Sequence, residues 1–217
     1  MNEVKAIILK EFKQEYRQKY LLGSILLYTL ATVFTSYISF RSINHPPTWN
    51  ALFWIILIFS AINSTSKSFL SENTGRQLYL YTLSSPHGIL FGKTIYNVLL
   101  MWVVAIFTLL IYSGFLGNLV QNWPLFLLNL FLGTMAFTSV LTIVSAITSK
   151  AGGNPGLMAI LSFPLMIPLL MNVLRVSKNA IDGIDPSLSY PFLLVTLLIN
   201  LVVLLLGYIL FPYLWRA

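Results

Sequence analysis

Few side chains in this sequence are equipped for catalysis or metal binding: it holds six Asp or Glu, two His and no Cys. Without Cys the chain has no disulfide, thiolate metal site or cysteine nucleophile. One short motif, Gly88 to Thr94 with Gly92 and Lys93 inside it, resembles a phosphate-binding loop. That loop requires four residues between its glycines and follows a strand. Here three residues intervene and no strand is expected, so the sequence argues against nucleotide binding at this place.

The composition indicates what holds these few groups. AVILMFWYC residues make up 57% of the 217 positions and charged residues 9%, whereas soluble domains carry about a quarter charged residues. Such a chain has too little polar surface to cover a soluble fold. We therefore expect an all-α integral membrane protein. Its net charge of +7 is then better explained by basic loops that set orientation than by nucleic-acid binding.

Six uncharged segments are long enough to cross a hydrocarbon core of about 30 Å. They are predicted at about 21–40, 50–66, 94–116, 124–148, 155–174 and 191–214, in a single domain over 1–217. None of them contains Asp, Glu, Lys, Arg or His, although ion-driven transporters usually keep ionisable groups at membrane depth. The chain thus shows neither an energy source nor a catalytic set, and we expect a partner to supply the energy.

Residues 3–19 precede the first span and are predicted to form an amphipathic helix at the membrane surface. Apolar side chains recur there every four residues: Val4, Ile8, Phe12 and Tyr16. Charged residues, Glu15 among them, interrupt this stripe. The alternative is an ordinary cytosolic extension.

The basic residues predict the orientation. With the N-terminus inside, the inner segments carry ten Lys or Arg: five before the first span, three in 67–93, one in 149–154 and one at the C-terminus. The outer loops carry three: Arg41, Arg175 and Lys178. This bias places both chain ends in the cytoplasm.

The polar stretch 67–93 separates the second and third spans. It contains a short apolar patch: Leu78, Leu80, Tyr81 and Leu83. The Ser84-Ser85-Pro86 sequence can end one helix and begin another. A short helix there could present the patch to a cytosolic protein, or pack on its own bundle. The residues leave both alternatives open.

The same stretch resembles the cytoplasmic loop of ABC-2-type exporter permeases. In that class a coupling helix between the second and third spans docks on the ATPase subunit. The resemblance implies that the coupling residues are Glu72, Gly75, Leu78, Tyr81, Leu83, Pro86, Gly92 and Lys93. The class also has six spans and an N-terminal interfacial helix.

A second stretch narrows the resemblance. Lys150-Ala151-Gly152-Gly153, followed by LSFPLMIPLL at 161–170, is similar to the haem exporter protein B family (CcmB), and the likeness covers essentially the whole chain. It implies the membrane permease subunit of a haem-exporter-type ABC complex in the bacterial inner membrane, acting in c-type cytochrome biogenesis. One departure concerns the partner contact: relatives carry a denser acidic cluster where this chain has Glu72.

The resemblance also implies the partners. They are a separate ATPase that binds ATP, a second copy of this chain, other cytochrome c maturation subunits, a haem chaperone and the lipid bilayer. Haem is the implied cargo, with no covalently bound cofactor, and His45 in an outer loop is a candidate haem contact. Two alternatives stay open: an ABC-2 permease for a lipid, drug or polysaccharide, and a non-transport assembly scaffold.

The fifth span carries a predicted hinge. Pro164 and Pro168 lie four residues apart, each removes a backbone hydrogen bond, and Gly152 and Gly153 add a flexible corner. We expect this span to bend during the ATPase cycle, the alternative being a static kink. In the fourth span an i+4 row is predicted to be packing or a homodimer seam: Thr134, Thr138 and Thr142.

Overall fold

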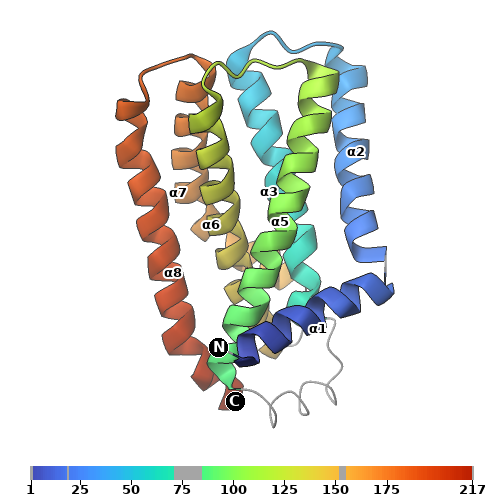
Figure 1. Cartoon of the computed structure of the whole chain (residues 1–217), viewed down its shortest axis with the longest axis vertical. Helices are drawn as coiled ribbons and strands as arrows, with labels where there is room; N and C mark the ends of the chain where they lie inside the picture. The colour runs from blue at the N-terminus through green and yellow to red at the C-terminus, as the bar shows by residue number, and fades with distance from the viewer. Residues whose placement is uncertain (1, 19, 71–84, 152–154, 217) are drawn as a thin grey trace.

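The chain folds into a bundle of long helices (Figure 1). The computed structural model describes residues 2–18, 20–70, 85–151 and 155–216, and within those ranges every regular element is helical. Six helices are long and apolar enough to cross a membrane, which confirms the predicted all-α, six-span fold. They are α2 (Tyr20–Phe40), α3 (Pro46–Leu70), α5 (Pro86–Leu116), α6 (Trp123–Lys150), α7 (Pro155–Ile181) and α8 (Tyr190–Arg216).

A further helix, α1 (Asn2–Gln18), lies across one end of the bundle instead of running along it (Figure 1). Both chain ends lie at this same end, which we call the α1 end. At the opposite, far end the 3-10 helix η1 (Pro186–Ser189) leads from α7 into α8. α3 ends and α5 begins at the α1 end (Figure 1).

α6 forms the centre of the bundle and packs against α3, α5, α7 and α8. Its row of Thr134, Thr138 and Thr142 is fully buried, and each hydroxyl donates to the carbonyl four residues earlier at 2.6 to 2.7 Å. Small hydroxyl side chains of this kind allow helices to approach closely. The row is thus interior packing, and the alternative of a homodimer seam is wrong because no part of it reaches the surface.

Several helices extend beyond the predicted spans, because a helix can continue past the end of its apolar run. α7 reaches Ile181, and α3 ends only at Leu70. α5 begins at Pro86, where the Ser85 side chain caps the helix by accepting from the Gly88 N–H at 3.2 Å. Residues 67–70 and 86–93 of the predicted loop are therefore helical.

α7 continues through Pro164 and Pro168 as one helix, and both prolines lie on its exposed side. The helix is thus not interrupted at these prolines, and a bend there during the ATPase cycle stays a prediction. The far-end part of α7 is held by two buried amides: Asn50 donates to the Leu174 carbonyl and Asn129 to the Val173 carbonyl, each at 2.9 Å. The prolines lie on the α1-end side of that attachment, and movement there stays a prediction.

Candidate functional site: the junction of α1, α3 and α5

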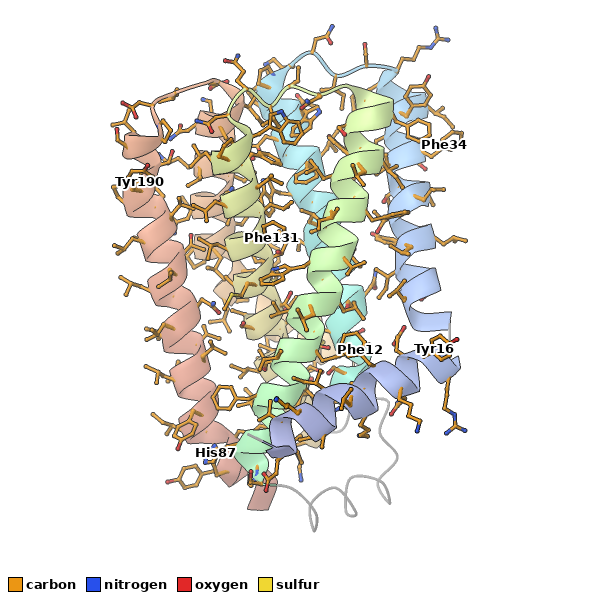
Figure 2. All side chains as sticks on the ribbon, viewed as in Figure 1. Phe12, Tyr16, Phe34, His87, Phe131 and Tyr190 are labelled. Carbon is orange, nitrogen blue, oxygen red and sulfur yellow. The ribbon has the colours of Figure 1, made fainter. Side chains whose placement is uncertain are left out.

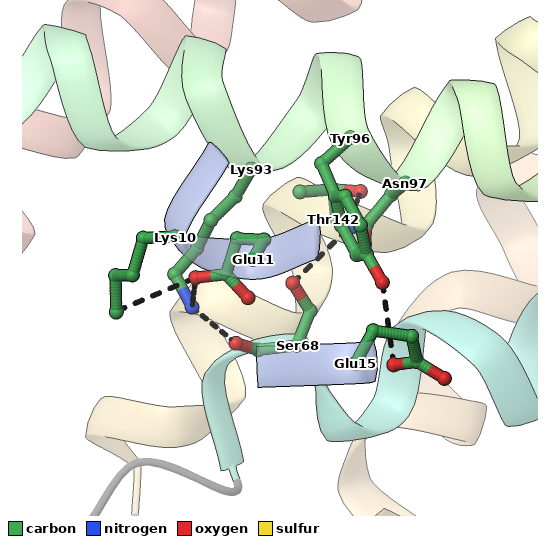
Figure 3. A network of polar contacts seen from close by, with 8 residues as sticks. All are labelled: Lys10, Glu11, Glu15, Ser68, Lys93, Tyr96, Asn97 and Thr142. Atoms are coloured by element: carbon green, nitrogen blue, oxygen red, sulfur yellow. Dashed lines mark hydrogen bonds and ion pairs between the residues drawn. The ribbon is translucent and has the colours of Figure 1, made fainter. Parts of the chain in front are cut away.

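One face of α1 carries a regular series of side chains directed at α5. Glu3, Ile7, Glu11 and Glu15 follow one another at a spacing of four residues, so they lie along one side of the helix. These four residues are called the α1 stripe below. Three of the six acidic residues of the chain are in it. Figure 3 shows the part of the junction around Glu11 and Glu15.

Glu3 is positioned at the start of α5. Its carboxylate accepts a hydrogen bond from the Ser85 hydroxyl at 2.7 Å and from the Ser85 N–H at 3.4 Å. These bonds favour the ionised form and lower the pKa of Glu3 below its ordinary value. Ser85 also caps α5, so Glu3 links α1 to the residue at which the 71–85 segment ends.

Glu11 lies opposite a buried lysine. The Lys93 amine is 3.6 Å from the Glu11 carboxylate, donates to the Ser68 carbonyl of α3, and lies 4.6 Å from the centroid of the Phe69 ring. The Lys93 side chain is only 1% exposed. A charge so deeply buried is tolerated only when it is paired and hydrogen-bonded. Lys93 thus joins α5 to both α1 and α3 (Figure 3).

Glu15 completes the stripe near the beginning of α2. One carboxylate oxygen accepts from the Tyr96 hydroxyl of α5 at 3.3 Å, and the other accepts from the Leu22 N–H at 2.7 Å. Leu22 is in the first turn of α2, where backbone N–H groups lack partners within the helix. Phe12 packs edge-on against the Tyr96 ring, with centroids 5.1 Å apart. The end of α1 is therefore attached to α5 and α2 together.

Glycines allow α1 to lie this close to α5. A Cβ atom on Gly92 would come within 2.7 Å of Ile7, and one on Gly88 within 3.0 Å of the Glu3 carboxylate. Both glycines are buried. This explains the motif that resembles a phosphate-binding loop: its glycines and Lys93 lie inside α5 and contact α1.

The polar contacts continue from the junction into the bundle. The Asn97 amide, one turn beyond Lys93, donates to the Ser68 hydroxyl of α3 and to the Thr142 hydroxyl of α6, both at 3.0 Å (Figure 3). Interhelical bonds of this kind stabilise membrane bundles. The junction therefore connects α1, α3, α5 and α6 mechanically, through hydrogen bonds and an ion pair.

The structure places the predicted coupling residues in two groups. Pro86 begins α5, and Gly92 and Lys93 lie within it beneath α1, so a coupling role for these two would act through α1. The others lie outside the described residues: Glu72, Gly75, Leu78, Tyr81 and Leu83. Whether either group couples to an ATPase stays a prediction.

The remaining predicted residues lie away from the junction. Gly152 and Gly153 of the proposed hinge are outside the described residues. His45 is exposed at the far end, with Nδ1 3.0 Å from the Thr48 hydroxyl. His87 is partly buried at the α1 end (Figure 2). Its ring stacks on Tyr208 of α8 with centroids 4.1 Å apart.

The α1 stripe is not among the predicted site residues. Glu15 is predicted only to interrupt the apolar side of the N-terminal helix, and no role is predicted for Glu3 or Glu11. Their signal was the spacing of four and eight residues, which places all three on one face. The prediction that Lys93 lies in a loop before the third span is wrong, because this residue is buried within α5.

These features define a class: a six-span helical membrane protein with a helix across the end that holds both chain ends, and no strand in the part of the chain described. A family model described as CcmB protein matches residues 2–210. The chain belongs to the CcmB family, as its resemblance to the haem exporter protein B family predicts. Searches of curated proteins and of solved structures returned no match. Membership of this family supports the general assignment of the chain as a permease subunit of a haem-exporter-type ABC transporter.

Proposed function

We propose that this chain is the permease subunit through which a separate ATPase drives haem delivery, or release of a haem-loaded chaperone, for c-type cytochrome biogenesis. Membership of the CcmB family supports a membrane complex with an ATPase and further cytochrome c maturation subunits. In this proposal haem is cargo, ATP binds to the partner, and two copies of the chain assemble in one complex.

The α1 end is proposed to face the cytoplasm. Of the eleven Lys and Arg residues that the structure describes, eight lie toward the α1 end and three toward the far end, in keeping with the positive-inside rule. Leu9, Phe12 and Tyr16 are exposed on α1, which suits a helix that lies in the membrane interface. Figure 2 labels Phe12 and Tyr16 on this helix. Both ends of the chain, the end of α3 and the start of α5 would then lie on the side of a cytosolic ATPase.

The observation that carries the coupling proposal is the junction itself. In the sequence the 71–85 segment joins α3 to α5, and Lys93 of α5 bonds to the last turn of α3 and pairs with α1. A force applied to the segment would reach α1, α3 and α5 together. The Asn97 contacts offer a path onward to α6.

The proposed function is tested by deleting the gene and staining membrane proteins for covalently bound haem. We expect c-type cytochromes to be lost while lipid and drug export continue, and the wild-type gene to restore them. Normal c-type cytochromes in the deletion strain would refute the proposal. Loss of lipid or drug export instead would assign the chain to another cargo.

A further inference from the structure

Lys93 is the most deeply buried charge in the described part of the chain, at 1% exposure. Its amine contacts Glu11, the Ser68 carbonyl and the Phe69 ring, which lie where α1 meets α3 and α5. Removal of one partner from a buried pair leaves an uncompensated charge. The pair therefore holds one particular register of α1 on α5.

The contact between α1 and α5 extends along the whole of α1. It begins at Glu3 on Ser85, passes Ile7 against Gly92, and ends at Glu15 on Tyr96. Glu15 lies twelve positions after Glu3, which corresponds to about 18 Å of helix at 1.5 Å per residue. A contact of this length, with a close glycine approach in the middle, resists sliding and rotation more than a single point would.

We propose that Lys93 is a positioning residue that fixes α1 on α5, so that α1, the start of α5 and the end of α3 move as one rigid unit when the ATPase acts. This inference rests on the proposed function. It requires that the contact between α1 and α5 stays closed throughout the ATPase cycle. α1 then transmits the movement to α2 through Glu15 and the Leu22 N–H.

A disulfide across the contact tests whether it stays closed. The Cβ position at Gly88 lies 3.5 Å from the Glu3 Cβ, within the range of about 3.5–4.5 Å found in disulfides. The chain has no native Cys, so the Glu3→Cys, Gly88→Cys pair would be the only one in this subunit. The complex is reconstituted in nanodiscs, oxidised, and assayed for ATPase rate before and after reduction, with each single-Cys variant as control.

A rigid unit predicts that the oxidised complex hydrolyses ATP within twofold of its reduced form. A tenfold or greater loss on oxidation, reversed by reductant and absent from both single-Cys variants, would overturn the proposal, because it would show that the contact must open.

The positioning role of Lys93 is tested separately by Lys93→Gln, with Lys13→Gln as control because Lys13 is exposed on α1. In the double-Cys background Lys93→Gln should lower the initial rate of disulfide formation at least fivefold, and Lys93→Arg, which keeps the charge, should restore most of it. Lys13→Gln should leave the rate within twofold. An unchanged rate in Lys93→Gln would refute the positioning role.

The disulfide rate is measured on this chain without ATP, so it distinguishes the two proposals. If deletion of the gene spares c-type cytochromes, the proposed function fails while the rate still reports on Lys93. If cytochromes are lost on deletion but the Lys93→Gln rate is normal, only the positioning role fails.

Discussion

Gly92→Ala should displace α1 from the bundle. The added methyl carbon would lie 2.7 Å from Cγ2 and 2.9 Å from Cβ of Ile7, whereas carbon atoms pack best at about 3.5–4.0 Å. α1 would have to retreat by about 1 Å to relieve this contact. Overpacking of this kind destabilises by about 1–3 kcal/mol, and alanine in place of glycine returns about 1 kcal/mol of helix propensity.

Gly114→Ala is the matched control. Gly114 is also in α5, and a Cβ atom there would meet nothing within 4 Å. Both variants therefore share the gain in helix propensity. The difference between their free energies of docking α1 on α5 reports the clash with Ile7, which is about 1–3 kcal/mol or a 5- to 150-fold change in the docking equilibrium. The double variant Ile7→Ala, Gly92→Ala removes the clash and should recover much of the docking.

The assay measures the rate at which trypsin cleaves the chain after Lys10 and Lys13 in proteoliposomes. When α1 undocks and redocks fast relative to cleavage, this rate follows the population of undocked α1. Gly92→Ala should be cleaved at least fivefold faster than Gly114→Ala. Equal rates for the two glycine variants would refute the close packing of α1 on α5.

Three further predictions concern other contacts. The Ser85 hydrogen bonds lower the pKa of Glu3, so they stabilise the docking of α1 above the ordinary pKa, and this stabilisation is lost as the pH falls through the lowered pKa. The rate of pepsin cleavage in α1 of the wild-type chain, divided by the rate for Glu3→Gln at the same pH, should therefore rise as the pH falls. A ratio that stays constant with pH would contradict this. Asn97→Leu removes two interhelical hydrogen bonds and should destabilise the bundle by about 1 kcal/mol. Its thermal midpoint in detergent should lie below that of the control Asn63→Leu, because Asn63 is exposed. Equal midpoints for the two variants would show that Asn97 does not stabilise the bundle. Pro164→Ala with Pro168→Ala restores two backbone donors and stiffens α7, so maturation of c-type cytochromes should fall, and normal maturation would exclude a hinge.

The six spans could be predicted from the sequence because each is an uncharged run of membrane-spanning length, and the bilayer leaves helices as the only simple solution. The start of α5 could also be predicted, since Ser85 and Pro86 are a strong local signal. Both predictions depend on neighbouring residues alone.

The junction could not be predicted in the same way, because it depends on residues far apart in the chain. Lys93 after a glycine reads as the edge of a loop until Glu11, 82 positions earlier, is known to lie against it. Gly92 reads as a helix breaker until Ile7 is placed on it. The four-residue spacing of the α1 stripe can be read from the sequence, but the sequence does not indicate that α5 is the helix it contacts.

The central claim is that a separate ATPase engages this chain at the α1 end, and its most direct test is co-purification. A tagged wild-type chain should retain an ABC ATPase in mild detergent. Leu78→Ala with Tyr81→Ala should lose it, and Leu110→Ala, an exposed apolar change in the far-end half of α5, should keep it. Absence of an ATPase from the wild-type preparation, or its equal retention by all three chains, would contradict the account.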